Sequence, residues 1–273
     1  MSNTSYINRL NRPLYTYAMI YLAFLYVPIL FLPLFSFNDG IYIAFPIKGF
    51  TTLWYEKMFS DGPMAEALMN SLKVGAITTV LATLLGIFGA KAVTRYRMPG
   101  KKSIVFVIML PLVVPGILLG VALLILMKQL GVELSLITVT MGHVLISVPF
   151  AMATLIPRFE GFDKSMEEAS ADLGANALST FWRVTLPMVA PGIVASLLLC
   201  FTISFDEFIM AFMLAGSEKT LPIHIFSQLR FPARLPPVLA LGTLIMVISF
   251  FVVFFSQWVK RYGADDQSST GVL

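Results

Sequence analysis

Two acidic residues, Asp206 and Glu207, stand next to each other in a segment that is otherwise apolar, between Phe205 and Phe208. A charged side chain inside a membrane span is costly and is therefore a candidate for function. Carboxylates beside aromatic rings suit an ammonium ion, which both groups attract. We predict that these four residues line the path of a cationic solute, with one acid facing the path and the other a neighbouring helix. A purely structural acidic pair is the alternative.

A second concentration of charge lies at residues 157–189, between two apolar segments. It holds five acids and three bases, in a chain of which only 12% of the residues are charged. A chain that lives in a membrane has no solvation reason to build a structured polar element of this size. We predict that this loop docks a soluble partner, with an ordinary surface loop as the alternative.

Local signals predict two short helices within the polar loop. Asp163 or Ser165 can cap the first helix, and Gly174 stands where a left-handed residue is expected to end it. Asn176 can cap the second helix, which Pro187 is expected to end before the next span begins. The predicted arrangement is therefore a helix, a glycine bend and a helix at the membrane surface.

The amino-acid composition indicates which class of protein contains these residues. The chain has 273 residues, of which 58% are hydrophobic, and its mean hydropathy is +0.84. No ordinary soluble domain has that balance, so we predict an all-α membrane protein with several spans. The low charge excludes an extended nucleic-acid surface, and the single cysteine, Cys200, excludes an internal disulfide and a cysteine-based metal site.

Motifs for catalysis are absent from the sequence. It contains no G-x-x-x-x-G-K-[ST] phosphate loop, so energy would come from another chain or from no ATP at all. Neither G-x-S-x-G nor H-E-x-x-H occurs, and its two histidines have no second type of ligand near them in the sequence. We therefore expect no enzyme activity, no metal site and no cofactor.

Six apolar windows are long enough to cross about 30 Å of hydrocarbon as helices. They are residues 14–37, 68–92, 104–127, 134–156, 190–214 and 238–258. In the third window, Pro111 and Pro115 are expected to kink the helix, and Gly116 and Gly120 match the small-x-x-x-small packing pattern. We expect the six windows to form one transmembrane domain over residues 1–273.

The distribution of basic residues predicts which loops face the cytoplasm. The connection between the second and third windows and its edge hold five bases and no acid: Lys91, Arg95, Arg97, Lys101 and Lys102. The positive-inside rule then places both termini and the loops 92–103 and 157–189 in the cytoplasm. Loop 215–237 carries a weaker signal in the opposite sense.

The polar loop resembles the EAA loop of ABC-importer permeases. Its sequence Glu168-Ala-Ser-Ala-Asp-Leu-Gly174 matches the Glu-Ala-Ala pattern with a glycine four residues after the last alanine, and Leu186-Pro187 matches a later Leu-Pro. Ser170 departs from the pattern at the second alanine, a small-for-small change. Elsewhere, Tyr26-Val-Pro28 and Ser204-Phe-Asp206-Glu207 are similar to the spermidine/putrescine branch of these permeases, and the similarity extends over nearly the whole chain.

This resemblance implies one subunit of a multiprotein importer in the bacterial inner membrane, with a fold like that of type I ABC-importer permeases. Two homologous permeases would form the pore, two cytoplasmic ATPase subunits would bind ATP and drive it, and an extracytoplasmic binding protein would deliver the substrate. The residues that the resemblance assigns to ATPase coupling are Glu167, Glu168, Ala169, Leu173, Gly174, Leu186 and Pro187.

The solutes that the resemblance implies are polyamines such as putrescine and spermidine. An opine or another small organic solute could pass through a similar frame. The alternative class is a self-sufficient secondary carrier or channel. Such carriers often contain inverted repeats, which we do not find clearly, and this class leaves the polar loop unexplained.

Overall fold

A computed structural model describes residues 3–268, with side chains described for residues 13–251. Within residues 3–268 the chain is helical and has no strand, and one isolated bridge joins Asn38 and Phe50. The predicted all-α class is confirmed. In the same range, five helices are long and apolar enough to cross a membrane, or six if the bent pair Lys101–Leu112 and Gly116–Gln129 is one span.

The chain divides into two compact units, Met1–Gly62 with Ser227–Leu273, and Pro63–Phe226. The elements of the first unit are α1 (Asn3–Ser36), α2 (Leu53–Ser60), η3 (Pro232–Arg234) and α12 (Leu235–Ser268). Helix α12 contacts both α1 and α2. The indole N–H of Trp54 donates to the carbonyl oxygen of Asn38 at 2.7 Å, and this bond fastens α2 to the chain that leaves α1.

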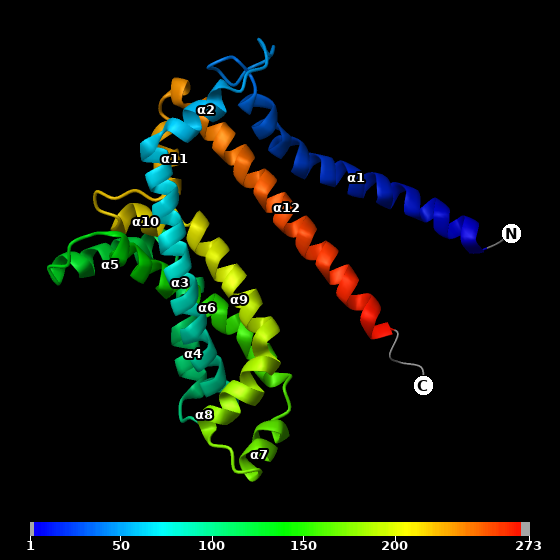
Figure 1. The fold of residues 1–273 in the computed structure, drawn as a ribbon, viewed down its shortest axis with the longest axis vertical. Helices are drawn as coiled ribbons and strands as arrows, with labels where there is room; N and C mark the ends of the chain where they lie inside the picture. The colour runs from blue at the N-terminus through cyan, green and yellow to red at the C-terminus, as the bar shows by residue number, and fades with distance from the viewer. Residues whose placement is uncertain (1–2, 269–273) are drawn as a thin grey trace. The chain divides into compact units, whose positions relative to one another are not determined.

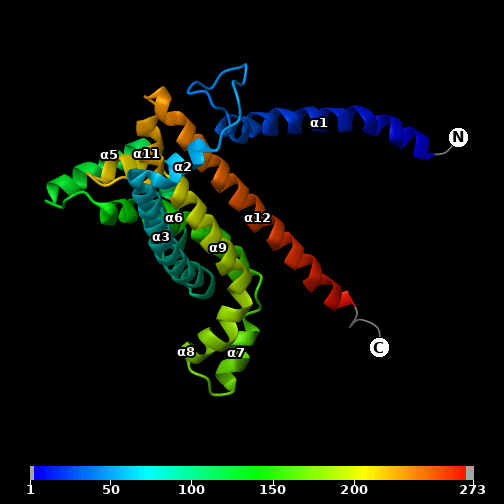
Figure 2. The same ribbon diagram turned by 45° about the horizontal axis from the view of Figure 1, so that its top comes forward.

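The unit of residues 63–226 is a helical bundle with short helices at both ends (Figures 1 and 2). Its elements, two of which cross the unit boundary, are α3 (Gly62–Arg95), α4 (Lys101–Met109), η1 (Leu110–Leu112), α5 (Gly116–Gln129), α6 (Leu136–Glu160), α7 (Ser165–Asp172), α8 (Ala177–Thr180), η2 (Phe181–Thr185), α9 (Leu186–Asp206), α10 (Ile209–Leu214) and α11 (Leu221–Gln228). Helices α7 and α8 lie at one end of the bundle, and α5 and α10 lie at the other. The polar loop and the acidic pair are therefore at opposite ends.

Small residues and apolar contacts pack α3, α6 and α9 together near the polar loop. The buried side chains of this cluster are Ile87, Ala90, Leu155, Phe159 and Val189. A Cβ at Gly86 would lie 2.6 Å from the Cβ of Ala151. Helices α3 and α6 can approach this closely because Gly86 has no side chain, which is the usual role of small residues between membrane helices.

Polar side chains also join these helices inside the bundle. The hydroxyls of Thr83 and Ser196 lie 3.2 Å apart between α3 and α9, and Nδ1 of His143 lies 2.8 Å from the hydroxyl of Ser204 between α6 and α9. The side chain of His143 is 1% exposed. Hydrogen bonds between membrane helices contribute to their association, so His143 has a packing role here.

The third predicted span is broken between its two halves. The segments Lys101–Leu112 and Gly116–Gln129 meet at 100°, and Pro115 at the break has an extended backbone with ψ 130°. Proline cannot donate a helical hydrogen bond, which favours a break at this point. Of the two glycines that match the packing pattern, Gly120 packs, because a Cβ there would lie 3.1 Å from Met213. A Cβ at Gly116 would meet nothing within 4 Å.

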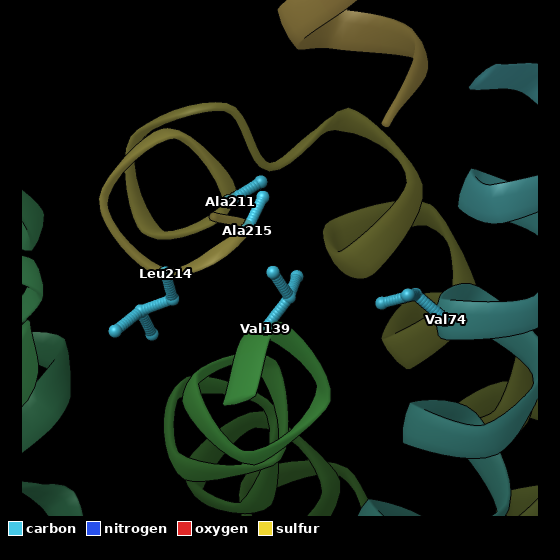
Figure 3. Close-up of a cluster of buried hydrophobic side chains, with 5 residues drawn as sticks. All are labelled: Val74, Val139, Ala211, Leu214 and Ala215. Atoms are coloured by element: carbon cyan, nitrogen blue, oxygen red, sulfur yellow. The ribbon is translucent and has the colours of Figure 1, made fainter. Parts of the chain in front are cut away.

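A second apolar cluster holds α10 at the end of the bundle opposite the polar loop. Its buried side chains come from α3, α6 and the α10 region, and they are Val74, Val139, Ala211, Leu214 and Ala215 (Figure 3). The hydroxyl of Thr138 donates to the carbonyl oxygen of Leu214 at 2.7 Å. These contacts position α10 and, with it, the acidic pair that precedes it in the chain.

Candidate coupling loop and candidate substrate path

The first short helix of the polar loop is α7, and an acidic side chain hydrogen-bonds the backbone at its start. The Oδ1 atom of Asp163 accepts a hydrogen bond from the backbone N–H of Ser165 at 3.0 Å. Of the two capping candidates in the sequence, Asp163 is therefore the one whose side chain bonds the first turn of the loop helix. Hydrogen bonds from the backbone and hydroxyl of Ser165, with a smaller contribution from the charge of Arg95, hold the pKa of the Asp163 carboxyl below its usual value.

A Schellman motif ends α7 at Gly174. The N–H of Gly174 donates to the carbonyl of Ala171 at 2.9 Å, and the N–H of Ala175 donates to the carbonyl of Ser170 at 3.1 Å. Gly174 has a φ of +84°, so the predicted left-handed residue is confirmed. A Cβ at this position would meet nothing within 4 Å. The backbone conformation, and not a crowded neighbour, is therefore what favours glycine.

The second half of the loop continues directly into the next span. Oδ1 of Asn176 accepts from the N–H of Ser179 at 2.8 Å and begins α8, as predicted. The prediction that Pro187 ends this helix is wrong, because helical structure runs from Ala177 through the π-helix η2 to Asp206. A proline has no N–H and crowds the preceding turn, and the wider π turn directly before it accommodates both effects.

Most of the residues assigned to coupling lie on the open surface. Glu168, Ala169, Leu173, Gly174 and Pro187 are exposed, while Glu167 and Leu186 are partly buried. Five large apolar side chains of this described segment are at least half exposed: Met166, Leu173, Leu178, Trp182 and Met188. Ser170, which departs from the EAA pattern, hydrogen-bonds Thr180 at 3.0 Å and so joins α7 to α8. The loop therefore combines a fixed internal geometry with an exposed, partly apolar surface.

Arg95, at the C-terminal end of α3, also belongs to this site. Its Nε lies 2.9 Å from Oε2 of Glu167, and its Nη2 donates to the carbonyl oxygen of Phe162 at 2.9 Å. Oε1 of Glu167 accepts from the hydroxyl of Thr185 at 2.5 Å. Sequence reasoning assigned Arg95 to the basic loop alone. No local pattern indicates that it meets Glu167, because the two residues are far apart in the chain.

The two acids of the candidate substrate path have different surroundings. Helix α9 ends at Asp206, earlier than the predicted span of 190–214, and Glu207 has an extended backbone with ψ 113°. Oε1 of Glu207 accepts from the N–H groups of Ile209 at 2.9 Å and Met210 at 3.1 Å, which caps α10. Asp206 is exposed and, within the described residues, has no hydrogen-bond or ion-pair partner. Asp206 is thus the carboxylate that is open to a ligand.

Aromatic residues flank the two acids in the chain and pack against further rings. The ring of Phe205 stacks on that of Phe201 with 5.7 Å between centroids. The ring of Phe208 lies 4.9 Å from that of Phe226 and 5.4 Å from that of Phe212. Phe226 was not among the predicted path residues, because it comes from α11 and no local pattern links it to the acids. The rings and Asp206 together offer both elements of a cation site.

Comparisons with known proteins agree with this architecture. The chain is 34% identical over 240 residues to the spermidine/putrescine transport system permease protein PotC of Haemophilus influenzae. The aligned region covers 88% of this chain and 93% of that protein. It is 33% identical over 253 residues to the putrescine transport system permease protein PotI of Escherichia coli K12, with coverages of 90% and 89%. Each of these sequence matches therefore extends over most of this chain and most of the related protein.

A solved structure shares the fold. It is that of a bacterial ABC transporter involved in the import of the acidic polysaccharide alginate, with a TM-score of 0.71 and 17% identity. The match covers 96% of this chain and 98% of that one. At this level of identity the match concerns the arrangement of the helices, and it confirms the predicted likeness to an ABC-importer permease fold.

The fold and its structured polar loop define a multi-spanning membrane protein of the permease class. Residues 82–262 match the family described as the binding-protein-dependent transport system inner membrane component. The chain belongs to this family, and it is an integral protein of the inner membrane. The predicted class and location are thereby confirmed.

Proposed function

We propose that this chain is the permease subunit of an ATP-driven importer for polyamines such as putrescine and spermidine. The observation that carries the substrate class is Asp206, an exposed carboxylate without a partner among the described residues, at the end of an apolar helix. Polyamines are small linear cations whose ammonium groups match a carboxylate and aromatic faces. The names of the relatives PotC and PotI support the same class of solute.

The roles within the candidate path follow from the contacts of each residue. Asp206 would attract an ammonium group of the solute, while Phe205 and Phe208 would offer their ring faces. Glu207 already accepts two backbone hydrogen bonds, so its first role is to hold α10 in place. The path therefore needs one acid for the solute and uses the other to fix the geometry around it.

The polar loop is the proposed docking element for a cytoplasmic ATPase. In this assembly the chain pairs with a second, homologous permease, two ATPase subunits supply the energy, and an extracytoplasmic binding protein delivers the solute. ATP is bound by the partner subunits, and this chain itself needs no cofactor. The support is the exposed Leu173, whose apolar side chain is 89% exposed beside the left-handed Gly174 in an otherwise polar loop.

Uptake by the complete complex tests this proposal. Proteoliposomes that contain the complex with its native partners, supplied with binding protein, are expected to accumulate labelled putrescine or spermidine with ATP inside and to accumulate none without it. An uncharged solute of similar length serves as the control for cation selectivity. Accumulation that continues without ATP would instead indicate a self-sufficient carrier, and transport of the uncharged solute alone would contradict the proposed substrate class.

A further inference from the structure

One ion pair joins the polar loop to the transmembrane helices, between Arg95 at the end of α3 and Glu167 in α7. The guanidinium Nε is 2.9 Å from Oε2 of Glu167, although its N–H does not point directly at that oxygen. A second nitrogen of Arg95 donates to the carbonyl oxygen of Phe162, and the guanidinium carbon lies 5.0 Å from the centre of the Phe162 ring. Arg95 therefore holds both the start of the loop and its first helix.

The same carboxylate reaches a third segment. Oε1 of Glu167 accepts a hydrogen bond from the hydroxyl of Thr185, at the last position of η2. Thr185 is fully buried, and the next residue begins α9. Through its two oxygens, Glu167 thus connects the end of α3 to the turn from which α9 starts.

Burial distinguishes this pair from the other ion pair of the loop. The side chains of Arg95 and Glu167 are 10% and 15% exposed, whereas those of Lys164 and Glu168 are 61% and 62% exposed. An exposed pair contributes little and forms and breaks easily. Separating a largely buried pair is costly, because each partner would then be a buried charge without compensation. The two side chains of such a pair therefore stay together when the segments that carry them move. The Arg95 pair is therefore a stiff link, and the Lys164 pair is not.

We infer that Arg95 is a positioning residue that transmits movement of the polar loop to α3 and α9. The inference rests on the proposed function, in which an ATPase docks on this loop. When the ATPase moves α7, the link through Glu167 makes the ends of both spans follow. Without it, α7 can move while the end of α3 stays in place. The EAA pattern covers Glu168 and Gly174, and Arg95 lies outside it.

The test is the number of solute molecules transported per ATP hydrolysed, measured in proteoliposomes with the assembled complex and labelled putrescine. Arg95→Gln is expected to lower this ratio by about 5- to 150-fold, the usual range of a coupling energy between sites. ATP hydrolysis and co-purification of the ATPase are expected to continue. Arg95→Lys keeps the charge without the planar fork, so its ratio should lie between those of Arg95→Gln and the wild type. Arg97→Gln, an exposed base two residues further on, is the matched control and should keep the wild-type ratio.

A milder pair of variants decides the matter if Arg95→Gln fails to insert. Thr185→Val removes the hydroxyl that Glu167 accepts from, and Thr185→Ser retains it. The inference requires a lower ratio for valine and a wild-type ratio for serine. Equal ratios in both variants, or a wild-type ratio in Arg95→Gln, would overturn it. Failure of the proposed function itself would give a different result, because the wild-type complex would then show no ATP-dependent uptake.

Discussion

Replacing Gly174 by valine is expected to lower polyamine uptake by about 5- to 30-fold while the subunit still inserts in the membrane. Gly174 has a φ of +84° at the end of α7. This conformation costs a residue with a Cβ roughly 1–2 kcal/mol, and a β-branched residue more. A free-energy cost of this size lowers the population of the bent conformation by about 5- to 30-fold. The bend between α7 and α8 would then be lost in most molecules, and with it the docking surface. Uptake and ATPase co-purification measure the effect.

Gly131 provides a matched control for this substitution. It has a φ of +69°, its N–H and that of Val132 form the same pair of bonds to Lys128 and Met127, and a Cβ there would also meet nothing within 4 Å. Gly131→Val therefore carries the same backbone strain at the end of the bundle away from the polar loop. Gly174→Asn should retain most activity, because asparagine tolerates this conformation. If the two valine variants lose uptake equally, the effect is general instability and not uncoupling.

Replacing Asp206 by asparagine is expected to weaken the uptake of putrescine at low concentration by roughly 10- to 150-fold. The substitution keeps the shape of the side chain and removes its charge. A hydrogen bond to a charged group contributes about 1.5–3 kcal/mol, which gives that range. Uptake by the assembled complex measures the change, with protein level and the affinity of the binding protein as controls.

Glu207→Gln is the companion variant to Asp206→Asn. Glutamine retains a side-chain oxygen that can accept the N–H groups of Ile209 and Met210, so α10 stays capped. Its effect on uptake should therefore be smaller than that of Asp206→Asn. A larger effect of Glu207→Gln would reverse the roles of the two acids. Unchanged uptake in both single variants and in the double variant would make the pair structural and remove the physical basis for a cationic cargo.

The parts of the molecule that the sequence predicts well depend on local signals. The left-handed Gly174 and the cap by Asn176 each arise from a few neighbouring residues, and the structure contains both. Most of the apolar windows correspond to long apolar helices, and the third is bent by 100° at its break. The interrupted path of the chain near Glu207 was not predicted, because the composition of residues 190–214 is apolar enough for one continuous span. The cap on α10 becomes visible only when the backbone of Glu207 is known to be extended.

Contacts between distant segments are the features that the sequence could not predict. Arg95 and Glu167 meet because α3 and α6 pack closely at Gly86, which brings the end of α3 beside the polar loop. In the same way, Phe226 reaches Phe208 through the placement of α11. Neither contact is indicated by a sequence periodicity or by a motif. A single amino-acid sequence does not show which charges or rings meet in the folded protein.

Cross-linking from the polar loop tests the central claim most directly. The chain contains one cysteine, Cys200, which is fully buried. The thiol introduced by Leu173→Cys is therefore the one that a reagent in solution can reach. In membranes that contain the assembled importer, a short thiol cross-linker at this position is expected to capture the ATPase, and a membrane-impermeant thiol reagent added outside should not reach it. Leu130→Cys, 65% exposed at the other end of the bundle, should give no ATPase adduct. An ATPase adduct from Leu130→Cys, or none from Leu173→Cys in an active complex, would contradict docking through the polar loop.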